Sequence, residues 1–238
     1  MDIARLLQPY VETLSDTQLA QVSTYLDLLL RWNARTNLTA IRDPAQIVTR
    51  HFGESFFLAS KLFGLKALGY LDIQITRCPD VLDLGSGAGF PAIPLLVFRP
   101  DITITLVEAH HTKAVFLREV LRALHLEAEV QNVRAEALPP ASADIVTLRA
   151  VEKFDSILPT AANLVRSVVM EAGRPRPAIT DFNQTPIPYP PSRFCGLALL
   201  ISSPQISRAR QVLLTWHFHP EIPIPNSQNR VVQLIEPK

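Results

Sequence analysis

Three glycines at alternate positions, Gly85, Gly87 and Gly89, follow the short apolar run 81–84. An apolar run that ends in a turn signal is typical of a buried strand in a parallel sheet. Glycines at such a turn let the backbone bend sharply and let a ligand approach without a Cβ in the way. The spacing predicts a ligand-binding turn, although a glycine turn without a ligand would have the same pattern.

Glu108 indicates what kind of ligand the turn would hold. It follows the apolar run 102–107, roughly twenty residues beyond the glycines, where an acid at the tip of the second strand can bind two ribose hydroxyls. The alternative is an ordinary exposed acid. Phe90 occupies the place of the last glycine in the G-x-G-x-x-G motif, which argues against an oxidoreductase with a dinucleotide.

With Asp83 in front of the glycines, the segment resembles the motif of S-adenosylmethionine (SAM) methyltransferases. A SAM site has no pyrophosphate to hold, so it does not require the third glycine at the dinucleotide spacing. We expect Phe90 to pack against the cofactor or the core, and Asp83 to hold the turn or the cofactor's amino group. The resemblance implies these cofactor-binding residues: Asp83, Gly85, Gly87, Gly89, Phe90, Glu108, Ala135, Glu136 and Arg149.

Strand and helix patterns alternate through the middle of the chain. Strands are predicted at 81–84, 102–107, 128–131 and 144–148, and helices at 91–98, 112–124 and 155–168. This alternation predicts an α/β fold with a mostly parallel, doubly wound sheet. The resemblance implies that it is the Rossmann-like fold of the class I SAM-dependent methyltransferases. Because ligands bind at the carboxyl edge of such a sheet, we expect Arg149, after the strand 144–148, at the boundary between cofactor and substrate.

The regions on either side differ in composition. The N-terminal one is predicted to be helical, with a capping box from Ser15 to Gln18 and a helix start at Asp43 and Pro44 that continues to about Phe63. Late strands are predicted at 197–201, 212–218 and 230–235, and the proline-rich stretch 173–193 is predicted to be a surface loop. We expect one domain over 1–238, made of a helical region (1–75), a SAM-binding core (76–170) and C-terminal strands (171–238).

Composition restricts the remaining possibilities. The 238 residues carry a net charge of +1, so no global positive field indicates nucleic acid, and any RNA contact depends on a local patch. No apolar run is long enough to span a membrane. Cys78 and Cys195 lie far apart without metal-type spacing, which favours reduced thiols in the cytoplasm and no metal site. Nothing indicates an obligate dimer, so a monomer is expected.

Two N-terminal segments make the resemblance more specific. Residues 32–39 fit W-N-x-x-x-N-L-T, residues 50–55 fit R-H-x-x-D/E-S, and the glycine turn ends in Phe90 and Pro91. In this order they resemble the bacterial 16S ribosomal RNA (guanine-N7) methyltransferase G family, RsmG or GidB. The resemblance covers nearly the whole chain and is weakest over 173–194. Two departures are Glu54, where the family has aspartate, and a missing lysine-glycine pair after the fifth strand near 201–203.

The resemblance implies SAM-dependent methylation of guanine N7 in 16S rRNA, in the 530 loop of the small subunit or an assembly intermediate. Guanine N7 has a lone pair and no proton, so the reaction needs positioning rather than a general base. Arginine suits this because it forks onto O6 and phosphate oxygens. The implied catalytic residues are Arg149, Arg134, Arg230 and Asn37. The alternative for each arginine is a solvated charge or a salt bridge.

Other polar residues have less specific interpretations. His51 shares a helical face with Glu54 and Ser55, and we expect it to be structural rather than a base. An RNA-contacting set is possible in the N-terminal region: Arg31, Arg35, Arg42, Arg50, Lys61 and Lys66. Two other functions stay open, a SAM-dependent methyltransferase acting on a small molecule or protein and a non-catalytic RNA-binding module.

Overall fold

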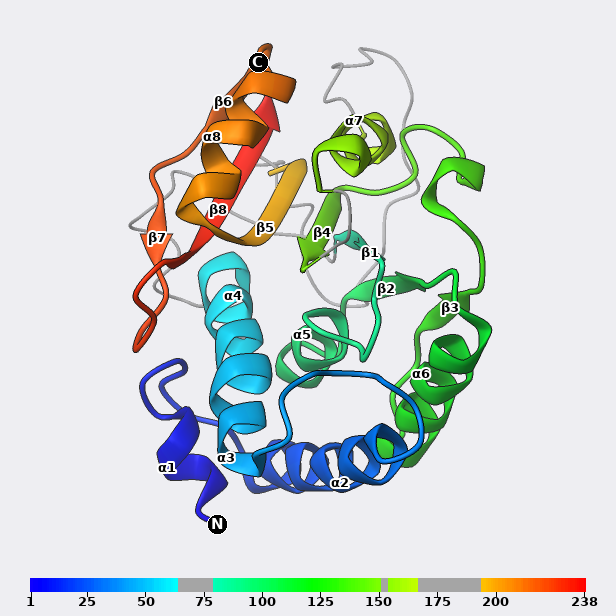
Figure 1. Ribbon diagram of the computed structural model, residues 1–238, viewed down its shortest axis with the longest axis vertical. Helices are drawn as coiled ribbons and strands as arrows, with labels where there is room; N and C mark the ends of the chain where they lie inside the picture. Colours follow the sequence, from blue (N-terminus) through cyan, green and yellow to red (C-terminus); the bar gives the residue numbers. More distant parts are fainter. Residues whose placement is uncertain (64–78, 151–153, 167–193) are drawn as a thin grey trace, which may run out of the picture.

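The computed structural model describes residues 1–63, 79–150, 154–166 and 194–238 (Figure 1). Its helices are α1 (Ile3–Leu7), α2 (Asp16–Asn33), α3 (Pro44–Ile47), η1 (Val48–Gly53), α4 (Glu54–Phe63), α5 (Ala92–Phe98), α6 (His111–Leu124), η3 (Ala135–Ala137), α7 (Phe154–Leu164) and α8 (Ser203–Val212). Its strands are β1 (Asp80–Leu84), β2 (Thr103–Val107), β3 (Glu129–Gln131), β4 (Ile145–Arg149), β5 (Gly196–Ser202), β6 (Trp216–Phe218), β7 (Ile222–Pro223) and β8 (Arg230–Pro237).

The strands form one sheet in the order β3-β2-β1-β4-β5-β8-β6, and β7 pairs with β8. Strands β1 to β5 are mutually parallel, whereas β8 runs antiparallel to β5 and to its other neighbours. The parallel strands place their carboxyl ends along a single edge, and the strand order reverses beside β1. The predicted α/β fold with a mostly parallel, doubly wound sheet is confirmed.

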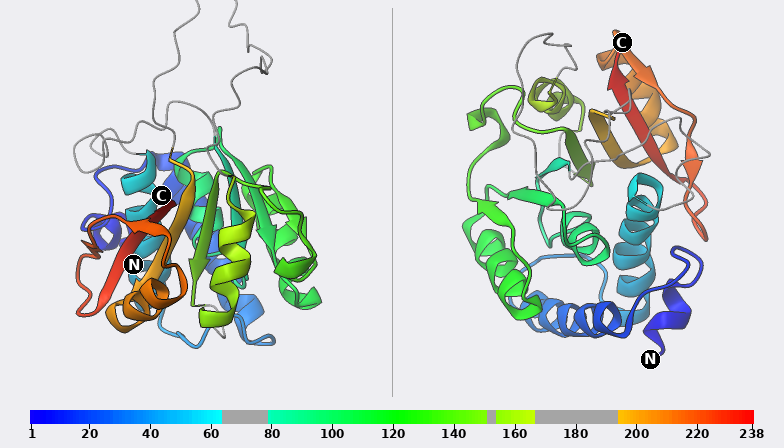
Figure 2. Two further views of the ribbon diagram at one scale, coloured as in Figure 1. Left: turned by 90° about the horizontal axis from the view of Figure 1, so that it is seen from above. Right: turned by 180° about the vertical axis from the view of Figure 1, so that it is seen from behind.

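The sheet is covered on both faces (Figure 2). One face packs against the N-terminal helices, α5 and α6, with Val81 and Ile104 among its strand residues. The other packs against α7 and α8, with Leu82 and Val146 among its strand residues. Successive residues of a strand point to opposite faces, so burial on both sides explains the continuous apolar runs of the central strands.

The N-terminal helices begin where the capping signals predict. Ser15 accepts a hydrogen bond from the Gln18 backbone, and the Gln18 side chain accepts one from the Ser15 backbone. Asp43 caps α3 by accepting a hydrogen bond from the Gln46 backbone at 2.7 Å, and Pro44 is at the start of this helix. The predicted helix to Phe63 is interrupted by the π-helical turn η1, which the sequence pattern does not show. Such turns inside helices are frequent at functional sites.

Several predicted bounds differ from the structure. The helix predicted at 155–168 ends at Leu164, followed by a single bridge between Val165 and Ala143. The strand predicted at 212–218 is wrong in its first part, because Val212 ends helix α8 and only Trp216–Phe218 is a strand. The loop predicted at 173–193, together with Cys78 and Lys66, lies outside the described residues.

Within the described parts of the chain, no helix has both the length and the apolar character that crossing a membrane would require.

Candidate cofactor and substrate site

A cavity of about 790 Å³ opens at the carboxyl edge of the parallel strands. This volume lies within the roughly 300–1,000 Å³ usual for small-molecule sites. Its walls come from the glycine turn after β1, the ends of β2 and β4, the turn at η3 and the N-terminal loop 38–41. The cavity therefore lies at the reversal of strand order, where open α/β sheets bind their ligands.

The glycine turn closes onto the end of β2. Gly85 and Ser86 donate backbone hydrogen bonds to the Val107 carbonyl at 2.9 and 3.1 Å. Gly87 has φ +57°, and a Cβ there would meet only the Gly85 carbonyl at 3.6 Å. The space in front of Gly87 is therefore open and belongs to the cavity. Both Gly85 and Gly87 line it, as the sequence predicts for ligand-facing residues.

Gly89 has a different environment, because it packs against α2. A Cβ at Gly89 would clash with the Tyr25 hydroxyl, and the residue has φ +87°. Tyr25 is fully buried, donates to the Ala88 carbonyl and stacks on Phe90 with centroids 5.2 Å apart. Phe90 lines the cavity while also contacting this aromatic cluster, so both roles predicted for it are compatible with its position. Gly89 itself does not line the cavity.

Glu108 joins the glycine turn to the second strand. Its Oε2 accepts from the Gly87 backbone at 2.8 Å and its Oε1 from the His110 backbone at 2.7 Å. Asn132 donates to the Glu108 carbonyl at 2.7 Å and so fixes the backbone that carries the acid. Each carboxylate oxygen has a second lone pair. Glu108 thus lines the cavity, and its carboxylate can accept further hydrogen bonds from a ligand.

Asp83 is buried behind the turn and does not line the cavity. Thr147 donates to its Oδ1 at 2.6 Å, and within the described residues its Oδ2 has no hydrogen-bond partner. Burial raises the pKa of Asp83 from 3.8 to about 6, against the lowering effect of the hydrogen bonds from Thr147 and Ser86. The predicted contact between Asp83 and a cofactor stays a prediction.

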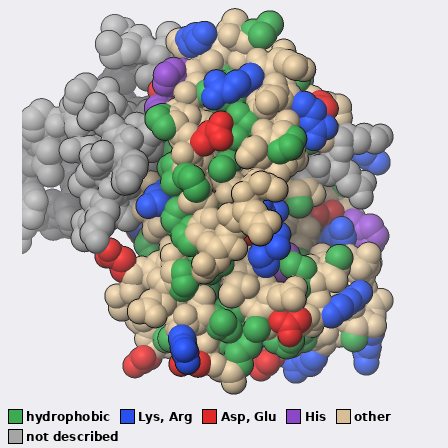
Figure 3. All heavy atoms as spheres, turned by 60° about the vertical axis from the view of Figure 1, so that its left-hand side comes forward, with side chains coloured by type: hydrophobic (Ala, Val, Ile, Leu, Met, Phe, Trp, Pro, Cys, Tyr) green, Lys and Arg blue, Asp and Glu red, His purple; other side chains and the backbone are tan. Residues whose placement is uncertain are grey.

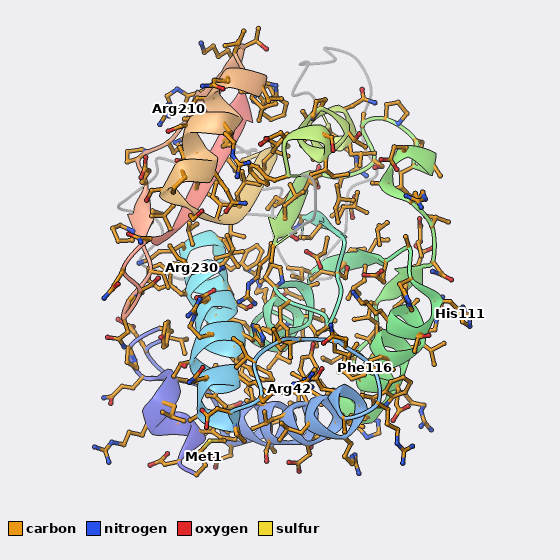
Figure 4. All side chains as sticks on the ribbon, viewed as in Figure 1. Met1, Arg42, His111, Phe116, Arg210 and Arg230 are labelled. Atoms are coloured by element: carbon orange, nitrogen blue, oxygen red, sulfur yellow. The ribbon has the colours of Figure 1, made fainter. Side chains whose placement is uncertain are left out.

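Glu54 gathers three arginines at the other end of the cavity. Its Oε1 pairs with Arg50 Nε at 3.1 Å, and its Oε2 pairs with Arg149 Nη2 at 3.0 Å and Arg230 Nη2 at 2.9 Å. The arginines come from η1, β4 and β8, and Arg230 lies against α4 (Figure 4). We call Glu54, Arg50, Arg149 and Arg230 the arginine cluster. It carries three positive charges and one negative charge, so it favours an anion.

Two arginines of this cluster face the cavity, and one of them has unused donors. Arg230 Nε and Nη2 are buried and, among the described residues, have no aligned hydrogen-bond acceptor. Arg149 lies above the Phe90 ring, 5.9 Å from its centroid. Burial lowers the pKa of Arg149 from 12.5 to about 10, with Glu54 opposing the change, so Arg149 keeps its charge at neutral pH. Both side chains reach the cavity wall.

His51 is held between Arg149 and the N-terminal loop. Arg149 Nη2 lies 3.1 Å from His51 Nδ1, and a guanidinium can only donate, so Nδ1 carries no proton. His51 Nε2 therefore donates to Thr39 Oγ1 at 2.8 Å. Burial lowers the pKa of His51 from 6.5 to about 3, and the nearby arginines add to this. A neutral ring with both nitrogens engaged is not placed to take a proton.

The remaining predicted site residues lie in two places. Arg134, Ala135 and Glu136 line the cavity at the turn after β3, and Arg134 is exposed at its rim. Asn37 is exposed and does not line the cavity, although the next residues, 38–41, do. The structure thus does not bring Asn37 to the three predicted arginines in this conformation.

The basic residues of the N-terminal region are not all available to a partner. Arg42 donates from Nη1 to the Asn33 carbonyl at 2.7 Å and so closes the end of α2. Lys61 lies 4.9 Å from the centroid of the Phe57 ring. Arg31 and Arg35 are exposed. On the face shown in Figure 3, Lys and Arg side chains are scattered among acidic, hydrophobic and uncharged ones.

Sequence reasoning did not identify Glu54 as the centre of the arginine cluster. It placed Glu54 on a helical face with His51, whereas the structure pairs it with residues from the middle and the end of the chain. The signal in the sequence was an acid one helical turn after Arg50 in an apolar helix. An acid in such a helix requires a cation nearby.

A family model described as rRNA small subunit methyltransferase G (GidB) matches residues 18–170. A protein named ribosomal RNA small subunit methyltransferase G from Xanthomonas euvesicatoria pv. vesicatoria is 42% identical over 149 residues, which cover 62% of this chain and 64% of the relative. One of the same name from Chloroflexus aggregans is 40% identical over 159 residues, covering 64% and 62%. The match thus spans slightly less than two thirds of these relatives.

Solved structures resemble the fold at low sequence identity. A SAM-dependent methyltransferase from Aquifex aeolicus has a TM-score of 0.52 and 13% identity, covering 84% of this chain and 97% of that protein. A ribosomal protein L11 methylase from Lactobacillus delbrueckii has a TM-score of 0.53 and 11% identity, covering 78% and 79%. At these identities the similarity supports the fold alone.

Proposed function

Because the chain belongs to the rRNA small subunit methyltransferase G family, we propose that it transfers the methyl group of SAM to guanine N7 in 16S ribosomal RNA. One observation carries the proposal beyond the family match. A single cavity joins a glycine turn and a strand-end acid to a cluster of arginines around the buried Glu54. The glycine turn and the acid suit a ribose-containing cofactor, and the arginine cluster suits a nucleotide.

The residues of the cavity fit SAM. The open space at Gly87 admits a ligand against the backbone, and Glu108 has free lone pairs for ribose hydroxyls. Ala135 and Glu136 would border the adenine. Asp83 Oδ2, which has no hydrogen-bond partner among the described residues, is an anionic group behind the turn that a positively charged ligand would stabilise. SAM supplies an electrophilic methyl group on a sulfonium, and the protein has to place an acceptor in line with it.

The arginine cluster suits the acceptor. Arg149 and Arg230 would donate to guanine O6 or to neighbouring phosphates, and Arg134 at the rim would contact the RNA backbone. Donation to O6 fixes the base without removing a proton from it. Guanine N7 has none to lose, which agrees with a site where His51 is neutral and has a pKa of about 3. The proposed reaction therefore needs no titrating base.

Glu54 would act as a positioning residue. It holds Arg149 and Arg230 on the same carboxylate oxygen, which fixes the directions of the two guanidiniums. A buried carboxylate also reduces the repulsion between them. The cavity opens to solvent, and a guanine from structured RNA would have to be flipped out or already exposed to enter it.

The test is methyl transfer from labelled SAM to small ribosomal subunits that lack their native modifications. We expect one labelled 7-methylguanosine, located by mapping, and we propose the 530 loop as its position. Arg149→Ala should abolish transfer and preserve the fold. The matched control is Arg208→Ala, because Arg208 is half exposed and pairs only at the surface with Asp155 at 3.3 Å.

The other outcomes separate the alternatives. SAM binding without transfer to rRNA, whether naked or in subunits, would indicate a small-molecule or protein substrate. RNA binding without SAM binding would indicate a non-catalytic module. Normal turnover by Arg149→Ala would contradict the role proposed for the arginine cluster.

A further inference from the structure

Three potential metal ligands meet on the antiparallel edge of the sheet, far from the cavity walls described above. His217 lies on β6, His219 follows this strand and Glu236 lies on β8. His217 is paired with Glu236 in the strand register. Cross-strand partners share a face, and so do residues two apart on one strand. The pattern therefore places all three side chains on one face, and we call them the His-His-Glu cluster.

The ligand atoms are close to the spacing of a metal site. One ligand atom from each side chain lies within 4.8 Å of the others. His219 Nε2 is 3.1 Å from Glu236 Oε1. With metal–ligand bonds of about 2.0–2.1 Å, neighbouring ligands of a tetrahedral site lie about 3.3 Å apart. The His219–Glu236 edge already has this length, and His217 has to approach by a small side-chain rotation.

His219 has an unused ligand atom. Its Nε2 is buried and, among the described residues, has no aligned hydrogen-bond partner, although Glu236 is near. The backbone of His219 is fixed, since its N–H donates to the Leu234 carbonyl at 3.0 Å and its carbonyl accepts from Gln233 at 2.7 Å.

We propose that His217, His219 and Glu236 form a binding site for a transition-metal cation of the Zn²⁺ type. Two imidazole nitrogens and one carboxylate oxygen suit Zn²⁺, Co²⁺ or Ni²⁺ better than Mg²⁺ or Ca²⁺, which prefer oxygen ligands. His217 is exposed, so a cation can enter from solvent. Three protein ligands leave a fourth position for water, and the bound cation would clamp the short strand β6 onto β8.

The experiment uses the untagged full chain after removal of metals with a chelator. Zn²⁺ is titrated against a chromophoric chelator, and Co²⁺ is added separately to record its visible absorption. We expect one Zn²⁺ per chain and a tetrahedral Co²⁺ spectrum. His217→Gln and Glu236→Gln should each weaken Zn²⁺ binding at least tenfold. Zn²⁺ should raise the Tm of the unsubstituted chain and not that of His217→Gln.

The matched control is His111→Gln, the same substitution at an exposed histidine of α6, across the molecule from α8 and β6 (Figure 4). The His111→Gln variant should still bind one Zn²⁺ per chain, and Zn²⁺ should still raise its Tm. His217 is the preferred test position because its side chain is exposed and can be replaced without a folding defect. Less than one equivalent of Zn²⁺ on the unsubstituted chain, or equal affinity in His217→Gln, would overturn the proposal.

Discussion

At the scale of single residues, one buried carboxylate holds the arginine cluster together at one end of the cavity. Glu54 is 1% exposed and is in contact with guanidiniums from three separate parts of the chain. A buried charge contributes little net stability when paired, whereas removal of one partner leaves the others uncompensated. Glu54 is therefore a residue whose loss should affect stability and function together.

We predict that Glu54→Gln lowers the free energy of unfolding by about 3–5 kcal/mol, because it leaves buried positive charge unpaired. Urea unfolding at neutral pH measures this. Asp155→Asn is the control, since its pair with Arg208 is half exposed on both sides and should contribute at most about 1 kcal/mol. Equal effects of the two substitutions would show that Glu54 does not hold the arginine cluster together.

Asp83 gives a prediction with a defined pH dependence. Its pKa of about 6 in the folded protein exceeds the 3.8 of the unfolded chain, so the folded state binds more protons between these values. Stability from this group is therefore lost as pH rises from about 4 to about 6, by up to about 3 kcal/mol. Asp83→Asn keeps the polar contact with Thr147 and removes the charge.

The free energy of unfolding of Asp83→Asn, relative to that of the unsubstituted protein, should thus be higher at pH 8 than at pH 4. Thr147→Val is a useful companion, because it removes the 2.6 Å hydrogen bond to Asp83 without removing the carboxylate. If the difference between Asp83→Asn and the unsubstituted protein is the same at both pH values, Asp83 does not titrate as its burial implies.

The residues that could be predicted from sequence are those with local signals. The glycines and Glu108 are recognised by their spacing along one strand-turn-helix-strand unit, and all but Gly89 line the cavity. The partners of Glu54 have no such signal, since Arg149 and Arg230 reach it only through the packing of β4 and β8 against α4. Asn37 was assigned by resemblance alone, and the structure places it on the surface.

At the scale of elements, α2 supports the glycine turn from behind. Tyr25 reaches from this helix to the Ala88 carbonyl and leaves no room for a side chain at Gly89. The N-terminal helices are thus part of the site's support rather than an appendage. Gly87 and Gly89, two of the three positive-φ glycines of the turn, can be separated experimentally, because Gly87 faces open space and Gly89 does not.

We predict that Gly89→Ala is more destabilising than Gly87→Ala. Both substitutions force alanine into a left-handed conformation, at a cost of about 1–2 kcal/mol, whereas Gly89→Ala also places a Cβ in steric conflict with the Tyr25 hydroxyl. Chemical unfolding of the two variants measures the difference. Calorimetry with SAM adds a second readout, since Gly87 faces the cavity. Equal stability of the two variants would contradict the packing of α2 against the turn.

Helices and strands were predicted correctly where the hydrophobic pattern was long or where a capping signal also marked the start. The central strands and the helices capped by Ser15 and Asp43 lie within a few residues of their predicted bounds. Helix α8 was missed although Ser202 and Gln205 form a capping box, because only Ile206 and Ala209 of this helix are buried. The π-helical turn η1 depends on tertiary packing around Gly53 and the Tyr10 ring, which no local pattern records.

At the scale of the whole molecule, positive and negative charges nearly balance. RNA binding therefore has to depend on basic residues grouped at one place on the surface. The net charge is +1, and long-range steering of RNA is therefore weak. Any affinity for rRNA should depend on contacts around the cavity mouth. Arg134 is a predicted basic site residue that is exposed there.

We predict that Arg134→Ala weakens rRNA binding and reduces the slope of log Kobs against log salt by about 0.7–0.9, the loss of one phosphate contact. Filter binding at several salt concentrations measures it. Arg208→Ala, which removes an exposed arginine from α8, should leave the slope unchanged. A slope that stays constant in Arg134→Ala would show that this residue does not contact phosphate.

The order in which the chain is synthesised gives the arginine cluster a further consequence. Its basic members stand at positions 50, 149 and 230, and they emerge from the ribosome in that order. Until β8 has emerged, the β5 edge has no antiparallel partner and Glu54 lacks Arg230. Under the proposed function, a nascent chain cannot assemble the complete guanine site before β8 has been translated. The ability to modify a ribosome therefore requires that translation has passed Arg230 and the rest of β8.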